Sequence, residues 1–132
     1  MDTIATLATD LAAIVARAQD DRTERDAGWP VIVQFIDDFG RVDAISRSQA
    51  VADRPQTTGS SRWDAFVAAL VDHLCRTNGV QAPRWVHDAV FVLDEWWFPS
   101  GYESLHATAL VESPAPFAVR GIFLTGRALD RR

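Results

Sequence analysis

The chain has 132 residues, of which 48% are hydrophobic, and a formal net charge of -5. That length is typical of one domain, and the apolar fraction excludes a wholly disordered chain. The acidic balance argues against a general nucleic-acid binder, because phosphate contacts need a clustered positive face. Residues 1–60 hold ten acidic residues and six arginines, so most of the negative charge lies in this half.

The N-terminal sequence and the number of cysteines indicate where in the cell the protein is expected. Cys75 is the only cysteine, which excludes an internal disulfide and is typical of cytosolic proteins. No basic region precedes an apolar stretch at the N-terminus, and Asp10 interrupts that stretch, so we expect no signal peptide. No apolar run approaches the ~20 residues of a membrane span. We therefore expect a cytoplasmic protein that does not enter a membrane.

The first predicted element is a helix from Asp2 to about Asp26. Its apolar residues recur at steps of three and four and form one stripe, which consists of Ile4, Leu7, Leu11, Ile14, Val15 and Ala18. The residues from Gln19 onward are polar on all sides, so this end of the helix is expected to project into solvent or fray. Gly28 and Pro30 are expected to end the helix.

The next part of the chain predicts two short helices and a loop. A helix from Val31 to about Phe39 would begin directly after Pro30, although its β-branched residues also suit a strand. A second short helix covers about Asp43 to Ala52. Residues 54–60 include proline, glycine and threonine and predict a polar loop.

The clearest predicted helix runs from Ser61 to Asn78. Ser61 and Asp64 have the spacing of a capping box, and Gly79 suits a left-handed cap at the other end. One face of this helix is predicted to be buried, and its side chains are Trp63, Phe66, Val67, Leu70, Val71 and Leu74.

Shorter elements are predicted after Pro83. They are a helical turn within residues 85–93, a helix over 101–112, a turn opened by Pro114 and Pro116, a strand-like piece over 121–124 and a last turn to Leu129. The chain is therefore predicted to be all-α, a compact bundle of five or six helices with short connections. We expect a single domain over residues 1–132, with an N-terminal helix within 1–28 and a main helical body over 30–132.

No catalytic or metal-binding pattern stands out in the sequence. His73 and Cys75 are two residues apart, which points them in different directions on a helix, and no spacing resembles a zinc-binding pair. Ser104 and His106 lack the sharp glycine-flanked turn of a nucleophile elbow. We therefore expect no cofactor, no metal and no enzymatic activity.

Acidic and aromatic residues are the candidates for partner binding. Adjacent carboxylates diverge on a helix and make poor acid–base dyads, so they are either solvated surface or a docking face for a basic partner. The run Trp96-Trp97-Phe98 is predicted to be either core or a protein-binding hot spot. The candidate partner-binding residues are Asp20, Asp21, Glu24, Asp37, Asp38, Trp96, Trp97 and Phe98.

Several segments carry a resemblance to a known family. They are Arg62-Trp63-Asp64-Ala65, Pro83-Arg84-Trp85-Val86, Leu93-Asp94-Glu95-Trp96-Trp97-Phe98-Pro99-Ser100, Ser113-Pro114-Ala115-Pro116-Phe117 and Arg120-Gly121-Ile122-Phe123. The pattern covers about Pro30 to Leu129 and resembles a family of small actinobacterial proteins that are encoded beside toxin genes, notably nucleotidyltransferase-like ones, and are treated as antitoxins. Some members carry an N-terminal helix-turn-helix, for which one helix within residues 1–28 is too little.

The resemblance implies an antitoxin-like protein that binds and neutralises a cognate toxin enzyme by direct contact. It implies no catalytic residue. The toxin would be a nucleotidyltransferase or a nucleotide kinase, and the antitoxin could also form a homodimer. One alternative is a transcriptional regulator or co-repressor subunit, although DNA binding by this chain alone is not expected, and another is a small enzyme of unknown chemistry. A regulator would need a basic face, and the one basic cluster near the end consists of Arg120, Arg127, Arg131 and Arg132.

Overall fold

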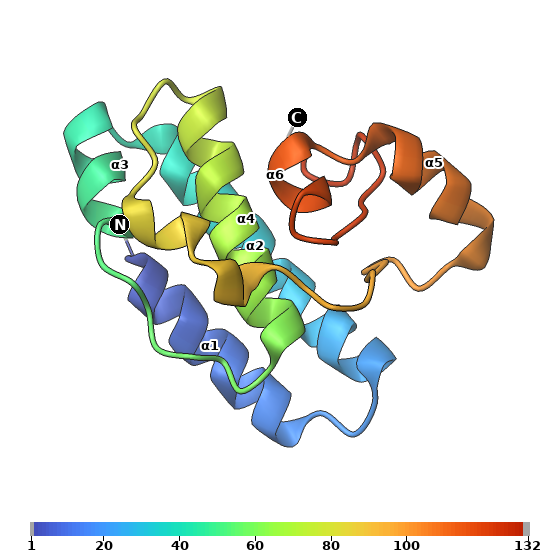
Figure 1. The fold of residues 1–132 in the computed structure, drawn as a ribbon. Helices are drawn as coiled ribbons and strands as arrows, with labels where there is room; N and C mark the ends of the chain where they lie inside the picture. Colours follow the sequence, from blue (N-terminus) through green and yellow to red (C-terminus); the bar gives the residue numbers. More distant parts are fainter. Residues whose placement is uncertain (1, 131–132) are drawn as a thin grey trace.

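Helices form the fold of residues 2–130, which are the residues that the computed structural model describes. Within this range the predicted all-α bundle is confirmed, and the only β-type pairing is one isolated bridge between Trp97 and Ile122. The elements, shown in Figure 1, are α1 (Ile4–Arg17), α2 (Asp21–Arg41), α3 (Ala44–Val51), α4 (Ser61–Thr77), three 3-10 turns η1 (Arg84–His87), η2 (Ala89–Phe91) and η3 (Glu103–Leu105), α5 (His106–Glu112) and α6 (Ala115–Ala118).

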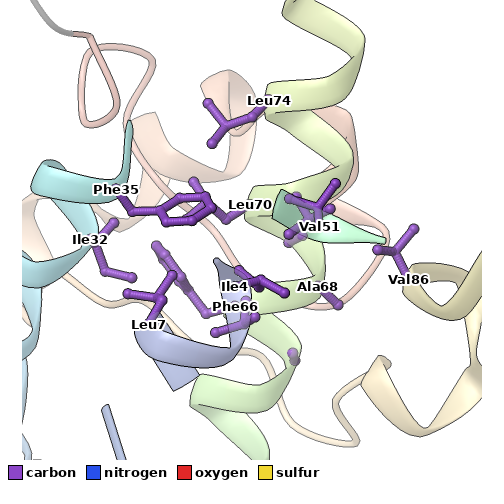
Figure 2. Close-up of a cluster of buried hydrophobic side chains, with 14 of the residues drawn as sticks. Ile4, Leu7, Ile32, Phe35, Val51, Phe66, Ala68, Leu70, Leu74 and Val86 are labelled. Atoms are coloured by element: carbon purple, nitrogen blue, oxygen red, sulfur yellow. The ribbon is translucent and has the colours of Figure 1, made fainter. Parts of the chain in front are cut away.

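Helix α4 is the centre of the molecule. Helices α1 and α6 and the turns η1 and η2 all pack against it, and α5 and α6 lie on the opposite side of it from α1 and α3 (Figure 1). The predicted buried face is confirmed, since Trp63, Phe66, Leu70 and Leu74 are at most 5% exposed. In Figure 2, Phe66 and Leu70 of α4 lie among the apolar side chains of the other helices.

Of the two caps predicted for α4, the one at the C-terminal end is right and the one at the N-terminal end is wrong. The C-terminal cap is confirmed: Gly79 has φ +67°, and the N–H of Val80 donates to the carbonyl of Cys75 at 2.9 Å. The predicted capping box of Ser61 and Asp64 is wrong. Ser60 caps the helix instead, and the Asp64 carboxylate accepts hydrogen bonds from the Thr58 backbone N–H and hydroxyl, both at 2.7 Å.

The predicted single helix over residues 2–26 is wrong, because the chain breaks earlier. Ala18 is extended, and Asp20 starts a new helix by accepting a hydrogen bond from the Thr23 N–H at 2.7 Å. Gly28 and Pro30 do not end a helix and lie inside α2. Packing outweighs their low helix propensity, because α2 buries an apolar stripe that continues beyond them to Phe39.

Gly28 lies where the Trp63 ring of α4 packs against α2. A Cβ atom at this position would lie 3.3 Å from two ring carbons of Trp63. The missing side chain leaves room for this ring, and it explains why a residue that resembles a helix terminator is buried in the middle of a helix.

The N-terminal helix is also part of the core. Helix α1 buries Ile4, Leu7 and Leu11, and Figure 2 shows Leu7 beside Ile32 of α2 and Ile4 near Phe66 of α4. The apolar stripe of α1 is thus covered by this chain's own helices. Residues 21–26, predicted as the polar end of the first helix, are instead the first turns of α2, and most of them are exposed to solvent.

The remaining predicted elements are present, and some of them are shorter than predicted. The helix predicted over Val31 to Phe39 is part of α2, and the one predicted over Asp43 to Ala52 is α3. The helix predicted over 101–112 is only η3 and α5. Beyond Leu124, the expected last turn is a hydrogen-bonded turn from Thr125 to Ala128 and not a helix.

A buried ion pair attaches the C-terminal segment to α4. A guanidinium N–H of Arg120 donates to the Asp72 carboxylate at 3.2 Å, and both side chains are less than 5% exposed. Arg120 also donates to the backbone carbonyls of Pro116 and Val86, both at 2.6 Å, and the other Asp72 oxygen accepts from Arg76 at 2.8 Å. No buried side-chain polar atom in residues 2–130 lacks a hydrogen-bond partner.

Truncation of Leu70 tests the packing of α4. Leu70→Ala removes a fully buried side chain and leaves a cavity, so it should lower the free energy of unfolding by ~2–4 kcal/mol. Urea denaturation followed by circular dichroism measures this loss. Leu110→Ala is the matched control, because Leu110 is 42% exposed. Equal stability of the two variants would show that α4 is not packed in this way.

Candidate partner-binding groove

Five of the eight candidate partner-binding residues line one groove. Asp21 and Glu24 reach it from the first turn of α2, and Trp96, Trp97 and Phe98 reach it from the long connection between η2 and η3. The acidic–aromatic groove has a volume of about 320 Å³ and is lined by Asp21, Glu24, Arg25, Arg62, Trp63, Trp96, Trp97, Phe98, Pro99, Gly101, Glu103 and His106.

The other three candidates lie elsewhere. Asp20 immediately precedes α2, where its side chain caps the helix. Asp38 accepts a hydrogen bond from Gln34 and lines two different surface depressions, near Asp2. Asp37 is in the same turn of α2 as Asp38 and does not line the groove.

The acidic side of the groove is partly paired. Asp21 forms an ion pair with Arg62 at 3.3 Å, and Arg25 forms one with Asp26 at 3.7 Å. Glu24 accepts a hydrogen bond from the indole N–H of Trp63 and has no ion pair among residues 2–130. Within the same range, Glu103 has neither an ion pair nor a side-chain hydrogen bond. The groove therefore contains two carboxylates without a cationic partner.

The aromatic side is held by backbone pairing. The N–H of Trp97 donates to the Gly121 carbonyl at 2.8 Å, and the N–H of Phe123 donates to the Trp97 carbonyl at 2.9 Å. Because side chains alternate along an extended segment, Trp97 points to the core while Trp96 and Phe98 point to the other side. Accordingly the Trp97 ring packs edge-on against Trp63 at 5.2 Å, whereas Trp96 and Phe98 contact Phe123.

The three predicted aromatics thus separate into two roles. Trp97 is half-buried and packs against the core, as the core alternative predicted. Trp96 is 64% exposed, and its ring lies edge-on against Phe123 with 5.0 Å between the centroids. Phe98 is stacked on His106 at 3.9 Å. Tryptophan is enriched in binding hot spots, so the exposed Trp96 ring is the candidate for that role.

A second depression adjoins the groove and was missed by the sequence analysis. This apolar pocket has a volume of about 550 Å³ and shares Arg25 and Pro99 with the groove. Its other lining residues are Asp26, Trp29, Pro30, Ser100, Tyr102, Leu124, Thr125 and Ala128. No local pattern links Trp29 to Leu124, since they meet only through the fold.

Arg25 lines both the groove and the apolar pocket, and Gly101 of the groove lies against it. Gly101 has φ +71°, and a Cβ atom at this position would collide with the Arg25 guanidinium. The positive φ favours glycine here, whereas the end of the flexible Arg25 side chain can move aside. Arg25 and Pro99 are the lining residues that the two depressions share.

The titratable groups outside the groove show no reactive arrangement. Burial raises the pKa of the Cys75 thiol to about 11, so the thiol stays protonated at neutral pH. Burial lowers the pKa of His73, which packs against Phe117. No group of three or more His, Cys, Asp or Glu in the described part of the chain could hold a metal ion. The groove lining offers carboxylates, guanidinium groups and aromatic rings but no serine or cysteine.

Of the basic cluster near the end of the chain, the structure describes Arg120 and Arg127. Arg120 is 3% exposed and paired with Asp72, so it is not available on the surface. Arg127 is exposed, and Arg131 and Arg132 lie outside the described residues. Burial of Arg120 removes a cation that a DNA-binding face would need.

Comparisons of the chain with protein-family models, with curated proteins and with solved structures gave no match. None of the helices described is both long and apolar enough to cross a membrane. The groove and its neighbouring pocket are therefore the features on which a functional proposal depends.

The dependence of Tm on pH in the acidic range tests the structural role of Asp20. Hydrogen bonds from Thr23 lower the pKa of its carboxyl, so its contribution is present above the unfolded pKa and is lost as the pH falls through the folded pKa. Asp20→Asn should lower Tm at neutral pH, and the difference from wild type should shrink as the pH falls below the ordinary pKa of an aspartate and vanish once the carboxyl is protonated in both states. Thermal melts at several pH values measure this. Asp53→Asn, outside any helix, is the control; a deficit that persists in acid would contradict the charged cap.

Proposed function

We propose that this chain is an antitoxin-like protein that binds a cognate toxin enzyme and neutralises it by direct contact through the acidic–aromatic groove. The observation that carries the proposal is the convergence of Asp21 and Glu24 with Trp96 and Phe98, more than seventy residues away in sequence, in one groove. The nature of the partner rests on the resemblance over residues 30–129 to proteins that are encoded beside toxin genes.

The chemistry of the groove suits such a partner. Nucleotidyltransferases and nucleotide kinases bind phosphate groups with basic residues, and an acidic partner complements such a site. Exposed tryptophans supply much of the binding energy in protein interfaces, and Trp96 is available for this role. Binding here would cover the toxin's nucleotide site and so stop its reaction.

The proposal places the protein in the cytoplasm and has one antitoxin chain bind one toxin. The free thiol of Cys75 and the absence of a disulfide suit the cytoplasm, where toxin and antitoxin would meet. The groove is complete within one chain, so one copy of the antitoxin is sufficient to bind one toxin.

Co-expression with the product of the adjacent gene tests the function. The two proteins should copurify, and the antitoxin should relieve the growth arrest that the toxin causes. Trp96→Ala should weaken the complex by about tenfold or more, because truncation of a hot-spot residue has this cost. Ile45→Ala is the matched control, since Ile45 is 71% exposed and lies on α3, away from the groove.

Two results would contradict the proposal. Absence of any complex or rescue would remove the antitoxin function. A complex that Trp96→Ala and Ile45→Ala weaken equally would retain the function but exclude the groove as its binding face.

A further inference from the structure

The charges in the acidic–aromatic groove do not balance. Its two arginines are already paired, Arg62 with Asp21 and Arg25 with Asp26. Glu24 and Glu103 have no cationic partner among residues 2–130. A cation that entered the groove would gain attraction from both carboxylates, whereas an anion such as a phosphate would be repelled.

The aromatic rings of the groove provide a second reason to expect a cation. The guanidinium carbon of Arg62 lies 5.7 Å from the centre of the Trp97 ring while the same side chain pairs with Asp21. This arrangement of ring, guanidinium and carboxylate already exists inside the groove. Trp96 offers a further exposed ring, and no cation of the described chain lies over it.

The neighbouring apolar pocket requires a different kind of side chain. Its wall contains the rings of Trp29 and Tyr102 and the side chain of Leu124, and it suits an aliphatic or aromatic residue. It shares Arg25 and Pro99 with the groove, so the two depressions adjoin. A single extended segment could therefore fill both.

We propose that the groove and the apolar pocket together bind one extended segment of the partner protein, in which a basic residue lies close to an apolar one. The arginine or lysine of this segment binds at Trp96 with Glu24 and Glu103, and the apolar side chain enters the pocket beside Trp29 and Leu124. The inference rests on the proposed function for one point, namely that the segment belongs to the toxin.

Selection from a random peptide library tests the specificity without any toxin. Phage that display the peptides are selected on the full-length chain, and the enriched sequences are synthesised and measured by fluorescence anisotropy. The enriched peptides should contain an arginine or lysine near a leucine, methionine or aromatic residue. Replacing that arginine by citrulline, which has the same shape without the charge, should weaken binding by about tenfold.

Matched variants locate the binding. Glu103→Gln and Trp96→Ala should each weaken binding severalfold, and Asp53→Asn and Ile45→Ala should leave it unchanged. Added salt should weaken binding to the wild type more than to Glu103→Gln. Enrichment of acidic or purely apolar peptides, binding that is insensitive to Glu103→Gln and Trp96→Ala, or no enrichment at all would overturn the specificity.

The outcomes separate this inference from the proposed function. Basic and apolar peptides that bind at Trp96, together with an adjacent gene product that does not, would retain the groove's specificity and remove the toxin as its partner. A toxin that is captured through another face, with no peptide selected on the groove, would retain the antitoxin function and remove the specificity.

Discussion

The buried pair of Asp72 and Arg120 is the interaction on which the C-terminal half of the structure depends. Burial of two charges carries a desolvation cost, which is offset here because Arg120 donates to Asp72 and to two backbone carbonyls, and Asp72 also accepts from Arg76. Removal of one partner would leave a charge buried and unpaired, which typically costs about 3–5 kcal/mol. The pair joins α4, the η1 turn at Val86 and the end of α6 in one network.

The groove depends on this network and on the start of α2. The backbone next to Arg120 binds the segment that carries the aromatics, through Leu93 and Trp97, and this pairing directs Trp97 inward and Trp96 outward. On the other side, the Asp20 cap begins α2 at the right residue, and Gly28 lets that helix approach Trp63. The acidic and aromatic walls therefore meet because two separate segments are each fixed to α4.

Much of the fold could be predicted from the sequence where the signal was local. The buried face of α4 and the cap at Gly79 follow from helical periodicity and backbone conformation. The break at Ala18 and the passage of α2 through Gly28 and Pro30 could not be predicted in this way, because tertiary packing outweighs the propensity of single residues. The candidate residues on α2 and at Trp96 were predicted separately, but only the fold brings them together. Arg120 has no local signal for its pairing with Asp72, which is 48 residues away.

Amide hydrogen exchange in Arg120→Lys tests most directly whether the buried pair holds the aromatic segment. Lysine retains the charge but cannot reproduce the planar set of donors that reaches Asp72, Val86 and Pro116. We predict that exchange accelerates at the Trp97 and Phe123 amides far more than at Ile32 in α2, and that Arg127→Lys leaves all three unchanged. Wild-type exchange rates at Trp97 and Phe123 in Arg120→Lys would contradict this account.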